Sequence, residues 1–173
     1  MTQEEIRIRS VYLFLACSRG IEQAVDRLMT TFPDSPPSSR PVLDKTLKRE
    51  VGLLFRYWTT RHIWEQLEAN EEDAKQLNLA LLRLFTETFR LAKDGSGMRY
   101  AELSSPHEEI QELRQRITNA LGVAPSLFAN ELEMEIVPWR DTVIRYTVDA
   151  VHSPLELLTV QVKAWAQRTP ETT

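Results

Sequence analysis

Arg61, His62 and Glu65 are the residues of this sequence whose types and spacing could act together chemically. On a helix, Arg61 and Glu65 stand four residues apart and can form an ion pair, and His62 lies within one turn of the same carboxylate. If the helix runs straight, the trio continues a buried face, where such a group needs partners and is often functional. If the helix turns near Thr59 and Thr60, the trio is solvated and avoids a large desolvation cost. We prefer the solvated interpretation.

Aromatic and basic side chains surround this trio in the sequence. Residues of these types are over-represented among those that dominate the binding energy at protein interfaces. Both interpretations of the trio leave them together on one part of the helix. The sequence therefore predicts a partner-binding surface made of Arg56, Tyr57, Trp58, Arg61, His62, Trp64 and Glu65.

The sequence contains no recognisable catalytic constellation. Its single cysteine, Cys17, lies in the apolar run 11–17 with no histidine nearby, so we interpret it as a small buried hydrophobe without a disulfide partner. No nucleophile is paired with a base, and there is no nucleophile elbow. Adjacent carboxylates such as Glu108 and Glu109 stand at predicted helix starts, where capping and the helix dipole account for them. We therefore favour a protein that is not an enzyme.

Asp149, His152 and Glu156 come closest to a metal-binding pattern, because Asp149 and His152 share the spacing of the helical Glu-x-x-His motif. Carboxylate-bridged bundle sites also need a second copy of that motif and further inward glutamates, which this sequence lacks. The Ser153-Pro154 break places Glu156 on another helix. No metal and no cofactor are therefore predicted, and a helical metalloenzyme remains a second alternative.

The composition is that of an ordinary globular chain. Among its 173 residues, 42% are hydrophobic and 27% are charged, and the presence of only five glycines favours helices over hairpins. A net charge of -4 gives no overall electrostatic attraction to nucleic acid or to an anionic membrane. The N-terminus is acidic, unlike a signal peptide, and the run 11–17 is far shorter than the roughly 18 residues that span a bilayer. We expect a cytoplasmic protein with no membrane partner.

The stretch Ile117–Leu132 resembles the helix-turn-helix pattern of bacterial regulators, with Gly122 at the turn and Pro125-Ser126 opening the second helix. The resemblance implies that the second helix would read DNA. That helix carries three acidic residues, Glu131, Glu133 and Glu135. Its first basic residue is Arg140. Because acidic side chains repel phosphates, we interpret the turn as a packing element and do not expect a nucleic-acid partner.

The candidate binding residues belong to a predicted central helix, 42–68, an uninterrupted run of good helix formers. Stepping 100° per residue places its apolar residues on one face and its basic residues on the opposite face. The predicted core face consists of Leu43, Leu47, Val51, Leu54, Phe55 and Trp58. Beyond Trp58 the charged trio continues this face, while the apolar residues Ile63, Trp64 and Leu67 lie on other faces of the helix.

Around the central helix we predict a single all-α domain of six or seven helices. A first helix at 2–31 starts with a Thr2/Glu5 capping box and contains Gly20, which is expected to loosen it. A Pro/Ser linker, 32–41, joins it to a helical bundle, 42–168, which a polar tail, 169–173, follows. Helices 2 and 3 should be antiparallel, because the sequence leaves no room for a long loop between them.

Two Ser-Pro pairs and one Pro organise the second half of the chain. Ser105-Pro106 and Ser153-Pro154 each predict a helix start with serine at the N-cap. Residues 131–137 alternate apolar and acidic side chains, which suits either a strand or a helix, and we prefer a helix. Pro138 is expected to break or kink that segment.

The leading functional hypothesis is a non-enzymatic cytoplasmic interaction or adaptor protein that binds another protein through its helix faces. The alternative is a small-molecule-sensing or nucleic-acid-linked regulator with a pocket between the central helix and Trp139 or Trp165. Exposed aromatic and leucine faces on a mobile first helix also favour a homodimer as a further possibility.

Overall fold

The computed structural model describes residues 1–30, 39–90, 98–122 and 129–168. Within these residues the chain forms six α-helices and one short 3-10 helix, and no strand. In chain order they are α1 (Gln3–Thr30), α2 (Arg40–Gln66), α3 (Glu71–Phe89), η1 (Met98–Glu102), α4 (Pro106–Leu121), α5 (Ala129–His152) and α6 (Leu155–Gln167). The predicted all-α bundle is confirmed.

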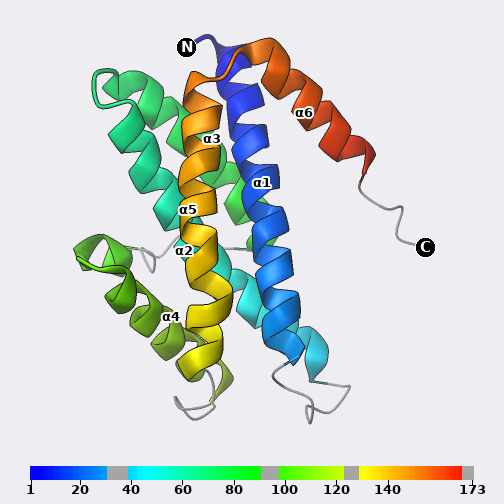
Figure 1. The fold of residues 1–173 in the computed structure, drawn as a ribbon, viewed down its shortest axis with the longest axis vertical. Coiled ribbons are helices and arrows are strands. Elements are labelled where there is room, and N and C mark those ends of the chain that lie inside the picture. The colour runs from blue at the N-terminus through cyan, green and yellow to red at the C-terminus, as the bar shows by residue number, and fades with distance from the viewer. Residues whose placement is uncertain (31–38, 91–97, 123–128, 169–173) are drawn as a thin grey trace.

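Four long helices, α1, α2, α3 and α5, pack around one core (Figure 1). α1 and α5 lie side by side, and α2 contacts both of them as well as α3. Only residues 67–70 connect α2 to α3, so these two helices pack antiparallel, as predicted. α4 packs on α2 and α5, and α6 turns away from the end of α5 and packs against α1 (Figure 1).

The apolar face predicted for α2 forms part of the core. Leu47, Val51, Leu54 and Phe55 are fully buried, and Trp58 is only 1% exposed. Cys17 of α1 is buried against the same helix, where its Sγ lies 3.4 Å from the Thr59 hydroxyl, and burial raises the pKa of the thiol to about 12. The interpretation of Cys17 as a small buried hydrophobe agrees with this environment.

Helix α1 is a central member of the bundle and not a separate arm. Its leucines Leu13 and Leu28 are fully buried, so they do not form the exposed leucine face that suggested a homodimer, while Phe14 and Leu15 are half-buried. Gly20 faces Trp139 of α5 and Phe55 of α2. A Cβ atom at this position would stand 2.8 Å from Trp139 Cε3 and 3.0 Å from Phe55 Cε2. The glycine therefore permits a close approach between helices.

The helix starts follow the predicted signals with one exception. The Thr2 N–H donates to Glu5 Oε2 at 2.6 Å and the Glu5 N–H donates back to Thr2 Oγ1 at 3.2 Å, and Ser105 and Glu108 form an equivalent box at α4. At α6, however, the N-cap is Pro154, and no side chain caps the helix. The predicted Ser153 cap is wrong, because Pro154 has an extended backbone and the helix begins only after it.

Two predicted boundaries change. The linker ends earlier than expected, because Arg40 and Pro41 already belong to α2, where proline is tolerated in the first turn. Residues 131–137 are helical, as preferred, but α5 runs as one helix through Pro138 instead of ending there. Ser39 of the linker is the N-cap of α2, and residues 32–38, the Pro125-Ser126 pair and the polar tail lie outside the described residues.

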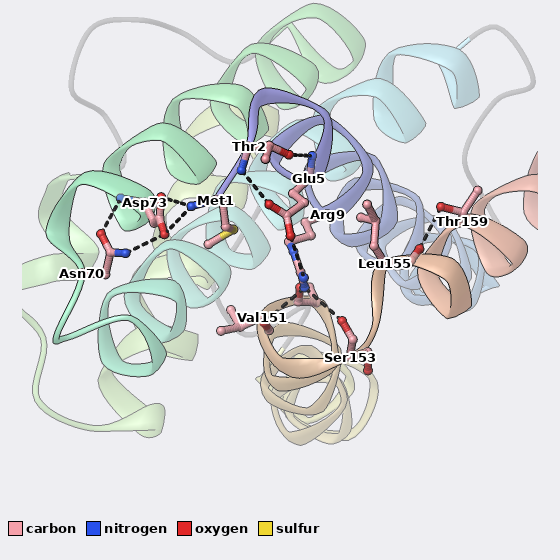
Figure 2. A network of polar contacts seen from close by, with 11 residues as sticks. Met1, Thr2, Glu5, Arg9, Asn70, Asp73, Val151, Ser153, Leu155 and Thr159 are labelled. Atoms are coloured by element: carbon pink, nitrogen blue, oxygen red, sulfur yellow. Dashed lines mark hydrogen bonds and ion pairs between the residues drawn. The ribbon is translucent and has the colours of Figure 1, made fainter.

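A polar network fastens the helix ends at the start of α1 (Figure 2). The N-terminal amine pairs with Asp73 at 2.7 Å, and Asn70, the N-cap of α3, donates to the same carboxylate. Arg9 is buried and donates to the carbonyl oxygens at the end of α5, those of Ala150, Val151 and Ser153 (Figure 2). A cation at a helix C-terminus satisfies carbonyls that have no partner within the helix.

Candidate functional site

A groove of about 600 Å³ lies between the second half of α2 and the segment that joins η1 to α4. One of its walls is a single face of α2, because residues spaced four apart on a helix share a face. The other wall is short and comes from the residues around η1. The lining residues are Arg56, Tyr57, Thr60, Arg61, Trp64, Glu65, Ala101, Leu103 and Ser104.

The η1 wall is held in place by an aromatic stack. The rings of Tyr57 and Tyr100 lie 5.7 Å apart with an interplanar angle of 26°, and Tyr100 is fully buried beneath the groove. Burial raises the pKa of Tyr100 above its ordinary value. The stack fixes η1 on α2, which makes the groove a preformed feature.

Trp64 is the large apolar side chain that the groove presents to solvent. It is 42% exposed, whereas the neighbouring Ile63 is fully buried. The apolar residues at the end of α2 therefore divide between core and surface. An exposed tryptophan beside polar residues is a common anchor of protein interfaces.

The trio of Arg61, His62 and Glu65 is neither fully buried nor fully solvated. Arg61 and Glu65 pair at 3.0 Å on the surface, with side chains 43% and 47% exposed. His62 is buried, and its Nδ1 lies 2.6 Å from the second oxygen of Glu65. Partial burial raises the pKa of Glu65, but hydrogen bonds from His62 and Arg61 outweigh this effect, so the pKa lies below its usual value. The solvated interpretation is correct for two of the three residues and wrong for His62.

A buried carboxylate, Glu109 of α4, lies behind the groove. Its side chain is fully buried, and the Trp58 indole donates to its Oε2 at 2.7 Å. Arg61 and Arg140 approach the same carboxylate only at 3.8 Å, and Oε1 accepts no hydrogen bond from any described residue. Glu109 therefore connects the core residue Trp58 with the groove residue Arg61.

Sequence reasoning missed Glu109. Its neighbour Glu108 does cap α4, as predicted for both residues. Glu109 instead points into the bundle, because α4 packs on α2 and brings this side of its first turn against Trp58. The sequence did contain a signal that Glu109 faces the core. It stands four residues before the buried Leu113, and residues with this spacing share one face of a helix.

Arg56 differs from the other charged residues of the groove. It is half-buried, and burial alone lowers the pKa of its guanidinium. None of the ion pairs formed within residues 1–30, 39–90, 98–122 and 129–168 includes Arg56. The groove therefore contains a partly desolvated positive charge without a carboxylate beside it.

The structure brings five of the seven predicted partner-binding residues into this groove and places two below it. Arg56, Tyr57, Arg61, Trp64 and Glu65 line the groove. Trp58 and His62 are 1% and 7% exposed, so they support the groove from inside.

The other predicted constellations separate in space. Asp149 accepts a hydrogen bond from Tyr12 at 3.4 Å, and His152 Nε2 lies 3.0 Å from the Gln66 side chain, while Glu156 is exposed on α6. In the described part of the chain, no three metal-ligating side chains come together. At the helix-turn-helix-like stretch, Gly122 ends α4 with a φ of 66°, and the turn that follows lies outside the described residues.

Comparisons with protein-family models, with curated proteins and with solved structures gave no match to this chain. They provide no functional information. Among the described helices, none is long and apolar enough to cross a membrane.

Proposed function

We propose that this protein is a non-enzymatic interaction or adaptor protein that binds another protein through the groove between α2 and η1. The observation that carries the proposal is the exposed Trp64 beside two arginines, Arg56 and Arg61, on one face of a well-packed helix. Tryptophan, tyrosine and arginine contribute most to interface energy when a rigid scaffold presents them.

The support for the groove is as important as its surface. Trp58 packs in the core and holds Glu109, and the Tyr57–Tyr100 stack holds η1. A preformed groove loses little conformational entropy when a partner binds. Ser104 is the lining hydroxyl that contacts a carboxylate, but this carboxylate belongs to Glu108, which caps α4, so binding is a better explanation of this surface than catalysis.

The proposal is tested by replacing the exposed anchor. Trp64→Ala should weaken binding of a directly interacting partner by about 2 kcal/mol or more, which is about 30-fold. Leu79→Ala on α3 is a matched control, because Leu79 is 43% exposed and lies outside the groove. Partners are captured from the native host with the full chain, identified by mass spectrometry, purified, and measured by calorimetry against each variant. Equal affinity of the wild type and Trp64→Ala for every partner would overturn the proposal.

A small-molecule-sensing role is the second candidate. The groove volume of about 600 Å³ falls within the range of ligand pockets, and Arg56 offers a charge for an anionic ligand. A second hollow, of about 510 Å³, is lined by Trp165, but its other walls come from α1, α5 and α6 and not from α2, so it is not the pocket between the central helix and Trp139 or Trp165 that was expected for this role. A thermal shift by a small-molecule library that Trp64→Ala removes would favour this candidate.

Self-association is a further candidate for the partner. Leu157 and Val160 of α6 are 49% and 64% exposed, and α6 lies at the edge of the bundle (Figure 1). Exposed apolar residues on an edge helix can pair with a second copy of the chain. Sedimentation of the wild type and of Val160→Glu tests this, because a dimer built on α6 should dissociate in the variant.

A further inference from the structure

The charges in the groove are unequally balanced. Arg61 pairs with Glu65, and Glu65 is also bound by His62, so these groups compensate one another. Arg56 has no carboxylate within ion-pair distance in the described parts of the chain, although it is half-buried. A guanidinium that has lost water without gaining a partner is costly, and an anion in the groove would offset that cost.

The polar and apolar ends of the groove lie at different heights along α2. Arg56, Thr60 and Trp64 follow one another at four-residue intervals and share one face of the helix. At 1.5 Å per residue, Arg56 and Trp64 are separated by about 12 Å along the axis. A ligand that meets both residues therefore needs a carboxylate at one end and a large apolar group at the other.

We infer that the groove binds an acidic segment of a partner protein, whose carboxylate pairs with Arg56 while a large apolar side chain packs against Trp64. The inference rests on the proposed function and specifies the chemistry of the partner. In an extended chain, a separation of about 12 Å corresponds to three or four residues. A free small acid such as acetate is too short to reach both ends, which favours a peptide segment.

The other residues of the groove are consistent with this orientation. Thr60 lies between the two ends and offers a hydroxyl donor to the backbone or carboxylate of the segment. Leu103 is half-buried on the opposite wall and adds an apolar contact. Near Trp64, Arg61 is already paired with Glu65, so the positive charge that has no ion pair in the described residues is that of Arg56, and the acidic group belongs beside it.

The experiment selects peptides from a random phage-displayed dodecapeptide library with the full-length protein. The enriched peptides should carry Asp or Glu three or four residues from a Leu, Ile, Phe or Trp. Synthetic versions should bind with an affinity that falls as salt increases. Arg56→Gln and Trp64→Ala should each weaken binding about tenfold or more, and Arg83→Gln, at an exposed position on α3, should leave it unchanged.

Two further variants protect the test from effects on folding. Arg56→Lys keeps the charge and should lose less affinity than Arg56→Gln. Arg56→Glu should bind a peptide in which lysine replaces the acidic residue more tightly than the original peptide. Melting curves of all variants identify any that do not fold.

The possible failures are distinguishable. Peptides that Trp64→Ala weakens but Arg56→Gln does not, or enriched peptides that are neutral or basic, would overturn the acidic segment and leave the groove as a binding site. If no peptide is enriched, or if the enriched peptides bind Trp64→Ala as they bind the wild type, both the acidic segment and the groove itself are contradicted.

Discussion

Two buried glutamates connect α2 with α4, and their surroundings differ. Glu50 of α2 is 2% exposed, and both of its oxygens accept short hydrogen bonds, from Arg49 and Arg116, each at 2.8 Å. Glu109 of α4 is fully buried, but its only hydrogen bond from a described residue comes from Trp58, and its nearest guanidinium groups stand 3.8 Å away. Both oxygens of Glu50 therefore have hydrogen-bond donors, whereas Oε1 of Glu109 has none among the described residues.

The difference separates a contact that fastens two helices from a contact that lies behind the proposed binding groove. At Glu50, each carboxylate oxygen accepts a hydrogen bond from an arginine, one from α2 and one from α4, and these contacts hold the two helices together. At Glu109, which lies behind the groove, Arg61 stands 3.8 Å from the carboxylate, and its close ion pair, at 3.0 Å, is with Glu65 at the surface. Well-satisfied buried networks stabilise a fold, whereas under-satisfied polar groups are typical of functional sites.

The largest effect on stability is expected at Glu50. Glu50→Gln removes the charge between two arginines and leaves at least one of them facing an amide donor, which should lower the free energy of unfolding by about 3 kcal/mol. Urea denaturation measures this value. Glu68→Gln, at an exposed position, is the control and should change stability by less than about 0.5 kcal/mol. Similar values for the two variants would show that Glu50 does not fasten the helices.

A smaller loss is expected when Glu109 loses its donor. Trp58→Phe removes the indole N–H, so a fully buried carboxylate is left without its hydrogen bond at 2.7 Å. The free energy of unfolding should fall by about 2 kcal/mol. The same urea titration measures the loss, and a variant as stable as the wild type would mean that the Trp58–Glu109 contact contributes nothing.

Glu109→Gln should cost less than either change. The amide oxygen can still accept from Trp58, and the oxygen that becomes an amide nitrogen has no hydrogen bond in the described structure to lose. We expect a loss of less than about 1 kcal/mol, measured in the same way. If this variant is destabilised as much as Glu50→Gln, the two carboxylates are equivalent and the contrast between them is wrong.

The smallest effect is a pH dependence at the exposed edge of the groove. The pKa of Glu65 lies below its ordinary value of 4.5 in the folded protein, so its contribution to stability is present above that value and is lost as the pH falls through the folded pKa. Below pH 4.5, Glu65→Gln should therefore show a flatter decline of unfolding free energy than the wild type. Superimposable profiles from acid titrations in urea would contradict the contribution of Glu65.

Local signals in the sequence predicted much of the fold. The capping residues at Thr2 and Ser105 and the core face from Leu43 to Trp58 depend on neighbours within one or two helical turns, which the sequence displays directly. Of the break or kink expected at Pro138, the break did not occur, because tertiary packing can override a local preference. Helix α6 starts after Pro154 because the backbone of Pro154 is extended. Rules that predict a helix start from a capping serine do not take this into account.

The candidate site was only partly predictable. The aromatic and basic residues of α2 are close in sequence, so their grouping on one helix could be predicted from residue types alone. The groove also needs Tyr100 and Leu103, and its support needs Glu109, which reach α2 from more than thirty residues away along the chain. Such contacts follow from how α4 and η1 pack, which helical periodicity does not specify.

The most direct test of the groove as a binding surface is site-specific photo-crosslinking in the native host. A photoreactive benzoylphenylalanine replaces Trp64 in one version of the full chain and Leu79 in a control version, two positions of similar exposure. We predict a discrete crosslinked partner from position 64 and none from position 79. The absence of a crosslink at position 64, or the same crosslinked partner from both positions, would contradict the groove as the binding site.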